Sequence, residues 1–113
     1  MAEHIKIRDA GGKWVIRACD AVIAESDRAL ELTEGDQPAV IYFPREDVAM
    51  AFFDATDSKT TCPHKGEARY YTIHGPSDTI VDAAWSYEAP LTAVGALKDH
   101  LAFYGSRVKI ERL

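Results

Sequence analysis

The chain has 113 residues, which is enough for one domain with a hydrophobic core. Of these residues 47% are hydrophobic and 27% charged, a composition that excludes disorder along the whole chain. Eighteen acidic against thirteen basic residues leave a net charge of −5, which argues against general binding to nucleic acids or to anionic membranes. No export signal or bilayer-spanning run is visible, and the two cysteines fit reduced thiols. We therefore expect a single cytoplasmic domain over residues 1–113.

The first third of the chain predicts short strands. Ile5 and Ile7 alternate with charged residues, and the alternation resumes over residues 13–19 after a glycine pair that suits a tight turn. Residues 33–38 have the composition of a loop. The apolar run 39–43 that follows is typical of a central strand.

The middle of the chain combines a polar stretch with a hairpin pattern. Residues 54–66 contain almost no large apolar side chain, so this stretch is interpreted as a long loop. Residues 67–74 and 79–87 flank Gly-Pro-Ser-Asp, a turn sequence between two strand-like segments. The pattern predicts an antiparallel β-hairpin over residues 67–87.

The spacing of the apolar residues changes after Pro90. Apolar residues then recur at helical spacing, and a glycine lies where a helix would end: Val94, Leu97, Leu101, Tyr104 and Gly105. We expect one helix of more than two turns within residues 91–104. The fold class is therefore α+β and mainly β, a small domain of short antiparallel strands with one C-terminal helix.

Four segments together resemble a known family. They are Tyr42-Phe-Pro-Arg-Glu-Asp-Val48, Thr61-Cys-Pro-His-Lys-Gly66, Ala83-Ala-Trp-Ser-Tyr87 and Ala102-Phe-Tyr104. The chain resembles, over most of its length, the family catalogued as domain of unknown function 427, which sometimes carries a nucleotidyltransferase-like name. The resemblance implies a small β-rich fold of the β-tent type and implies no established activity. The sequence departs from the family at His64, where the family has an aromatic residue, often tyrosine.

Metal ligands are not arranged as a zinc site requires. Many β-tent proteins bind zinc through two Cys-x-x-Cys knuckles, and this sequence has no such pair. Cys62 and His64 lie close in sequence, but the other cysteine and histidines are scattered. We expect no metal and no cofactor.

Charged and aromatic side chains in three of these segments suggest a ligand site. Arginine offers a planar fork and lysine a point charge to an anion, while aromatic rings wall small-molecule pockets. We expect Arg45 and Lys65 to approach one another across a cleft walled by Trp85 or Tyr87. The predicted ligand-binding residues are Arg45, Cys62, His64, Lys65, Gly66, Trp85 and Tyr87.

Each of these residues also has a structural interpretation. Arg45 could pair with a carboxylate such as Asp47, Cys62 could pack as a small apolar group, and the aromatic rings could belong to the core. The leading functional hypothesis is a module that binds a small polar or anionic ligand. The alternatives are an enzyme of nucleotidyl-transfer type and a structural interaction protein. The sequence defines neither a catalysed reaction nor an oligomeric state. Nucleic-acid and membrane partners are not expected.

Overall fold

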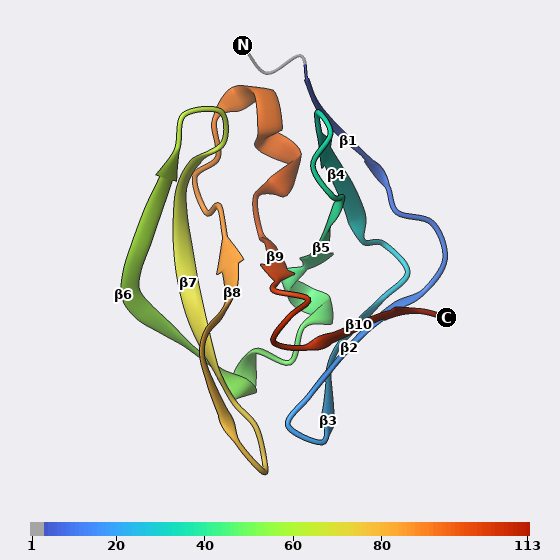
Figure 1. The fold of residues 1–113 in the computed structure, drawn as a ribbon, viewed down its shortest axis with the longest axis vertical. Helices are drawn as coiled ribbons and strands as arrows, with labels where there is room; N and C mark the ends of the chain where they lie inside the picture. Colours follow the sequence, from blue (N-terminus) through green and yellow to red (C-terminus); the bar gives the residue numbers. More distant parts are fainter. Residues whose placement is uncertain (1–3) are drawn as a thin grey trace.

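The computed structural model describes residues 4–113, which form two antiparallel sheets (Figure 1). The larger sheet has seven strands in the order β1 (Ile5–Asp9), β4 (Leu30–Glu34), β5 (Val40–Pro44), β9 (His100–Phe103), β8 (Thr79–Ser86), β7 (Gly66–His74) and β6 (Phe53–Cys62). The smaller sheet has three strands in the order β10 (Lys109–Arg112), β2 (Trp14–Ala18) and β3 (Ala21–Ser26).

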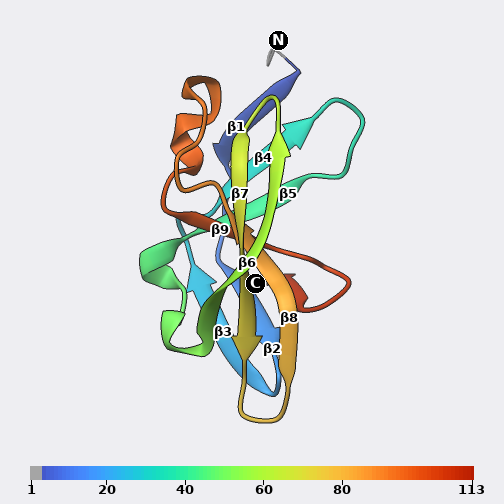
Figure 2. The same cartoon turned by 90° about the vertical axis from the view of Figure 1, so that its left-hand side faces the viewer.

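The helical segments are all short 3-10 helices: η1 (Arg45–Asp47), η2 (Met50–Phe52) and η3 (Thr92–Leu97). Both views place η3 at one end of the long axis and the β2–β3 hairpin towards the other (Figure 1 and Figure 2). Over the described range 4–113, no helix is long and apolar enough to cross a membrane.

The strand prediction for residues 67–87 is confirmed, since β7 and β8 form an antiparallel pair with the turn Gly75–Asp78 between them. The long loop predicted over residues 54–66 is wrong, because most of it is strand β6, paired with β7. β6 is an edge strand that is exposed along most of its length, so its sequence carries no alternation of apolar and polar residues.

The prediction of a helix within residues 91–104 is also wrong. The segment begins as η3, which has a kink at Val94, and turns at Asp99, where φ is +61°, into strand β9. β9 fills the centre of the large sheet between β5 and β8. Val94 and Leu97 of η3 and Leu101 of β9 are all buried, so two different elements together imitate helical spacing.

The core consists of two clusters on opposite faces of the large sheet. One lies between the two sheets and includes Ile41, Phe43 and Phe103. The other lies under η3 and includes Tyr42 and Tyr87 together with the apolar residues of η3. Successive residues of β5 therefore point into different clusters, as strand geometry requires. The aromatic residues of the second cluster lie next to the cavity described below.

Candidate ligand-binding site

A cavity of about 220 Å³ opens beside the second cluster, lined by residues of β4, β5, β7 and β8 and of the turn between β6 and β7. Five of its lining residues are aromatic: Tyr42, Tyr70, Trp85, Tyr87 and Tyr104. A concave site with this many aromatic walls is typical of small-molecule binding.

Strand pairing brings the central aromatic rings together. Tyr42 and Trp85 both pair with Ala102 of β9, one from each side. Because the alanine side chain between them is small, the two larger rings can meet above it. Their ring centroids are 6.4 Å apart in an edge-to-face arrangement, and the Trp85 Nε1–H donates to the Tyr42 hydroxyl at 3.3 Å. Tyr104 packs on the outer side of Trp85, with the centroids 4.6 Å apart. These contacts fix the walls of the cavity.

A largely buried ion pair supplies the charge of the cavity. The Lys65 Nζ donates to Oε1 of Glu34 at 2.7 Å, and only 12% and 18% of the two side chains are exposed. The hydrogen bond from Lys65 holds the pKa of Glu34 below its usual value. Burial acts to lower the pKa of Lys65, but the hydrogen bond to Glu34 and nearby negative charge outweigh it, so the net shift is upward. Both groups are therefore ionised at neutral pH.

The turn between β6 and β7 holds Lys65 in place. The Lys65 N–H donates to the Cys62 carbonyl at 3.2 Å, and the Lys65 carbonyl accepts from Leu91 N–H at 2.9 Å. Gly66 has φ of +116°, and a Cβ there would lie 3.3 Å from the Ala89 carbonyl oxygen. Glycine therefore lets the turn lie against residues 89–91, which directs the lysine towards Glu34.

The hydroxyls of Tyr42, Tyr87 and Tyr104 stay protonated at neutral pH. Burial raises the pKa of Tyr42 and of Tyr87 above the usual value. Burial and the contact with Tyr70 raise the pKa of Tyr104 to about 12. Neutral phenols donate a proton as well as accept one, and the Tyr42 oxygen already accepts from Trp85. The Tyr42 proton is thus available to a ligand.

Of the predicted site residues, Lys65, Trp85 and Tyr87 line the cavity. Cys62 and His64 do not line it but belong to the same turn. The Cys62 Sγ lies 3.8 Å from the Lys65 Nζ, and the His64 ring meets the ring of His4 edge to face at 4.9 Å. These two residues, like Gly66, support the turn that carries the lysine.

Arg45 lies elsewhere. Its Nη1 donates to the Tyr71 hydroxyl at 3.1 Å and approaches Glu88 at 3.9 Å, and it lines a separate surface hollow with Lys98 and His100. The hydrogen bond to Tyr71 raises the pKa of Arg45. The structure therefore does not bring Arg45 and Lys65 into one cleft, because each cation has its own internal partners.

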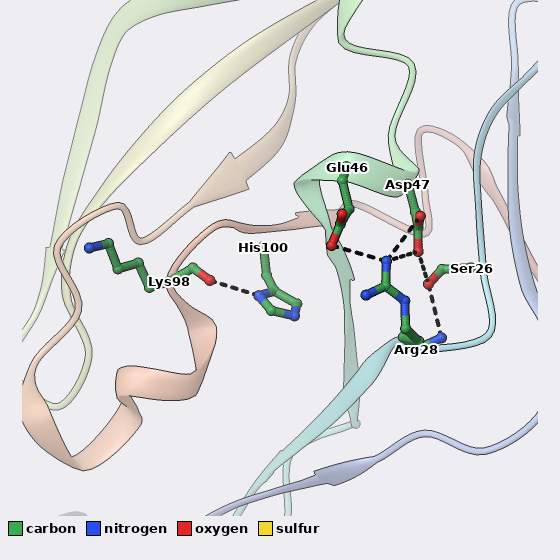
Figure 3. A network of polar contacts seen from close by, with 6 residues as sticks. All are labelled: Ser26, Arg28, Glu46, Asp47, Lys98 and His100. Atoms are coloured by element: carbon green, nitrogen blue, oxygen red, sulfur yellow. Dashed lines mark hydrogen bonds and ion pairs between the residues drawn. The ribbon is translucent and has the colours of Figure 1, made fainter.

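Asp47, considered above as a partner of Arg45, instead binds Arg28. The Arg28 guanidinium contacts Glu46 at 3.0 Å and Asp47 at 3.2 Å, and the Ser26 hydroxyl donates to Asp47 at 2.6 Å (Figure 3). These bonds tie β3 to η1. They are structural, and none of them involves a residue of the cavity.

Eight of the eleven residues that line the cavity were not among the predicted ligand-binding residues, and the polar ones include Glu34, Tyr42 and Tyr104. Glu34 is the last residue of β4, and the alternation Leu30-Glu-Leu-Thr-Glu34 could have indicated a strand ending there. No local signal links Glu34 with Lys65, since the two are 31 positions apart and meet only through the order of the strands.

Zinc binding can be tested directly. Among residues 4–113, no group of three or more His, Cys, Asp or Glu side chains is placed to hold a metal ion. The prediction that the protein carries no tight zinc rests on the missing Cys-x-x-Cys pairs. Metal analysis of untagged protein checks it, and near-stoichiometric zinc that survives dialysis would contradict it.

A family model described as a domain of unknown function (DUF427) matches residues 6–113. The matched range contains both sheets apart from the first residue of β1, and with them every residue that lines the cavity. A comparison with curated proteins finds no match.

Proposed function

We propose that this chain, which belongs to the DUF427 family, is a binding module for a small polar molecule that carries a flat ring and acceptor oxygens. The observation that supports this most is the cavity of about 220 Å³, which is lined both by five aromatic residues and by a lysine that is only 12% exposed. A buried ion pair is seldom better for stability than apolar residues of the same size. Its position in an aromatic cavity is therefore best explained by a ligand.

The hydrogen-bond donors of the cavity define the polar part of the ligand. An ammonium group has three donors, and that of Lys65 gives one to Glu34 and directs another towards the Cys62 Sγ. One N–H of Lys65 and the O–H of Tyr42 are then free to bind a ligand. Both are donors, so the ligand must offer acceptors such as carbonyl or carboxylate oxygens.

The charge of the cavity selects against a dianion. Glu34 neutralises Lys65 within the cavity, and Arg45 is not present to add a second positive charge. Placing a phosphate beside the Glu34 carboxylate would be repulsive. Among polar and anionic ligands, the cavity therefore favours amides, lactams and monocarboxylates over phosphate esters.

Isothermal titration calorimetry with benzamide, benzoate and phenyl phosphate tests the proposal, because the three share one ring and differ in charge. We expect saturable binding of benzamide and benzoate and weaker binding of phenyl phosphate. Lys65→Met should weaken the binding of both ligands at least tenfold, whereas Lys13→Met should not, because Lys13 does not line the cavity and pairs with Glu25 at the surface. If neither benzamide nor benzoate binds at millimolar concentration, the proposed ligand class is wrong.

Glu34→Gln should change the selectivity of the site. The substitution removes the negative charge that balances Lys65, so benzoate should gain affinity relative to benzamide by about fivefold to tenfold. Competition calorimetry at pH 7 measures this ratio, with Glu46→Gln as the control because Glu46 pairs with Arg28 outside the cavity. An unchanged ratio would show that Glu34 does not face the ligand.

We also propose that the fold is of the β-tent type and that the protein lies in the cytoplasm. Two antiparallel sheets agree with the β-tent type that the resemblance implies, and the free thiols of Cys19 and Cys62 suit a reducing compartment such as the cytoplasm. No observation on residues 4–113 favours nucleotidyl transfer or a purely structural role over binding.

A further inference from the structure

We infer that the ligand is amphipathic: its polar ring occupies the cavity of Lys65, and an apolar substituent lies in a groove that continues from it. This inference rests on the proposed function and adds the class of ligand. It comes from a second hollow of about 590 Å³, which is lined mainly by apolar side chains and lies directly beside the cavity.

The two hollows share a wall. Both are lined by Gln37 and Pro38 of the β4–β5 loop, Val40 of β5, and the contacting rings of Trp85 and Tyr104. The Trp85 and Tyr104 centroids are 4.6 Å apart, so one aromatic pair forms the border between the compartments. A molecule held against Trp85 in the cavity therefore has the groove within reach.

The groove passes the end of β9, where Tyr104 and Gly105 line it, and so reaches from the face of the cavity to the opposite face of the large sheet. It is apolar because it opens there onto the core between the sheets. Ile41 and Phe103 of the large sheet line it on one side, and Trp14 and Ile110 of the small sheet on the other. All four belong to the first cluster or pack against it. Ile41 and Phe103 are buried, while Trp14 and Ile110 are half-buried and leave apolar surface accessible at this edge. Covering that surface with an apolar group is favourable.

Charge and hydrogen bonding give a second polar group few partners in the groove. Its one charged lining residue, Glu31, already accepts from the Arg8 Nε at 2.7 Å, and the Trp14 Nε1–H is donated to the Gly11 carbonyl at 2.9 Å. The groove thus offers contact area with few free donors. The donors of the small cavity and the apolar groove match the two ends of one amphipathic molecule.

Calorimetry with alkylated probes tests the inference. Benzamide is compared with 4-methyl-, 3-butyl- and 4-butylbenzamide, on the full chain. Each methylene that enters the groove should raise the affinity by up to about fourfold, so the better butyl isomer should bind at least tenfold more tightly than benzamide. Butyl compounds that bind no better than benzamide would overturn the inference and leave the proposed function intact.

A groove-filling variant gives the matched control. Ala39 is exposed and lines the groove but not the small cavity, so Ala39→Trp should reduce the butyl gain to less than threefold while benzamide binds as before. Ala96→Trp, on the exposed face of η3, should change neither affinity. A butyl gain that persists in Ala39→Trp would show that the tail lies elsewhere, and the inference would be wrong.

The indole N–H of Trp14 gives a second readout, because the chain has only two tryptophans and Trp14 lines only the groove. In ¹⁵N–¹H spectra, butylbenzamide should shift the Trp14 indole signal and benzamide should not. If the proposed function itself is wrong, the result is different, because benzamide and benzoate then do not bind at all. Butyl compounds that bind while benzamide does not would overturn both statements, since the groove would then act alone.

Discussion

Phe43→Ala should lower the free energy of unfolding by about 3 to 5 kcal/mol, the largest loss expected from a single substitution in this chain. Phe43 is fully buried on β5, an inner strand of the large sheet. Its ring meets that of Phe103 edge to face at 5.9 Å, and Phe103 in turn contacts Phe53 at 6.0 Å. Removing the ring leaves a cavity between the two sheets and breaks this chain of aromatic contacts.

Urea unfolding followed by tryptophan fluorescence measures the loss. Domains of this size are stable by only about 5 to 15 kcal/mol, so the variant should lose a large share of its total stability. Phe43→Leu refills most of the volume and should recover more than half of the loss. Val81→Ala is the control, since Val81 is 60% exposed and should change stability little. A Phe43→Ala midpoint within error of wild type would contradict the described core.

Lys65→Met should lower the free energy of unfolding by about 2 kcal/mol at pH 7. Breaking a fully buried ion pair costs about 3 to 5 kcal/mol and breaking an exposed one at most ~1 kcal/mol. The Lys65 and Glu34 side chains are 12% and 18% exposed, which places this pair between the two limits. The substitution leaves the Glu34 carboxylate largely buried, and among residues 4–113 its remaining charged partner is His4, at 3.3 Å.

The effect of Lys65→Met should depend on pH. The pKa of Glu34 is lowered in the folded state, so the stability that its ionisation contributes is complete above its ordinary value of 4.5 and is lost as the pH falls through the folded value. The pKa of Lys65 is raised, so its contribution is present below 10.5 and is lost as the pH rises beyond it. The destabilisation should be largest between about pH 5 and 10.

Urea titrations of wild type and Lys65→Met at pH 7 and at pH 3.5 measure this difference. The double variant Glu34→Leu/Lys65→Met should regain most of the lost stability, because no unpaired charge is left in the cavity. Lys13→Met, which breaks a half-exposed pair with Glu25, serves as the control and should show no comparable change. Equal destabilisation at both pH values would mean that the loss comes from packing and not from the ion pair.

The sequence predicted elements well where one face of a strand is buried. Ile5 and Ile7 on β1 alternate with outward-facing charges, and residues 67–87 form the expected hairpin. Two strands were not predicted from the sequence, each for a physical reason. β6 is exposed on both sides, so neither face needs apolar residues, and β9 follows directly on η3, so the buried positions of both together have helical spacing.

The site could be predicted only in part, because its residues are joined by strand order. Lys65, Trp85 and Tyr87 stood out by their types and line one cavity. Arg45 is three residues beyond Tyr42 on the same stretch of chain, yet Pro44 ends β5 between them and Arg45 turns to Tyr71. The Glu34 carboxylate joins the site through the pairing of β4 with β5, which no local pattern encodes.

The most direct test of the account is an NMR titration of the two indole N–H groups with benzamide. Trp85 lines the small cavity and donates to the Tyr42 hydroxyl, whereas Trp14 lies outside it and donates to Gly11. We expect a saturable shift of the Trp85 signal, an unmoved Trp14 signal, and loss of the Trp85 shift in Lys65→Met. A Trp85 signal that stays in place at millimolar benzamide and benzoate, or that moves equally in Lys65→Met, would contradict the proposed binding site.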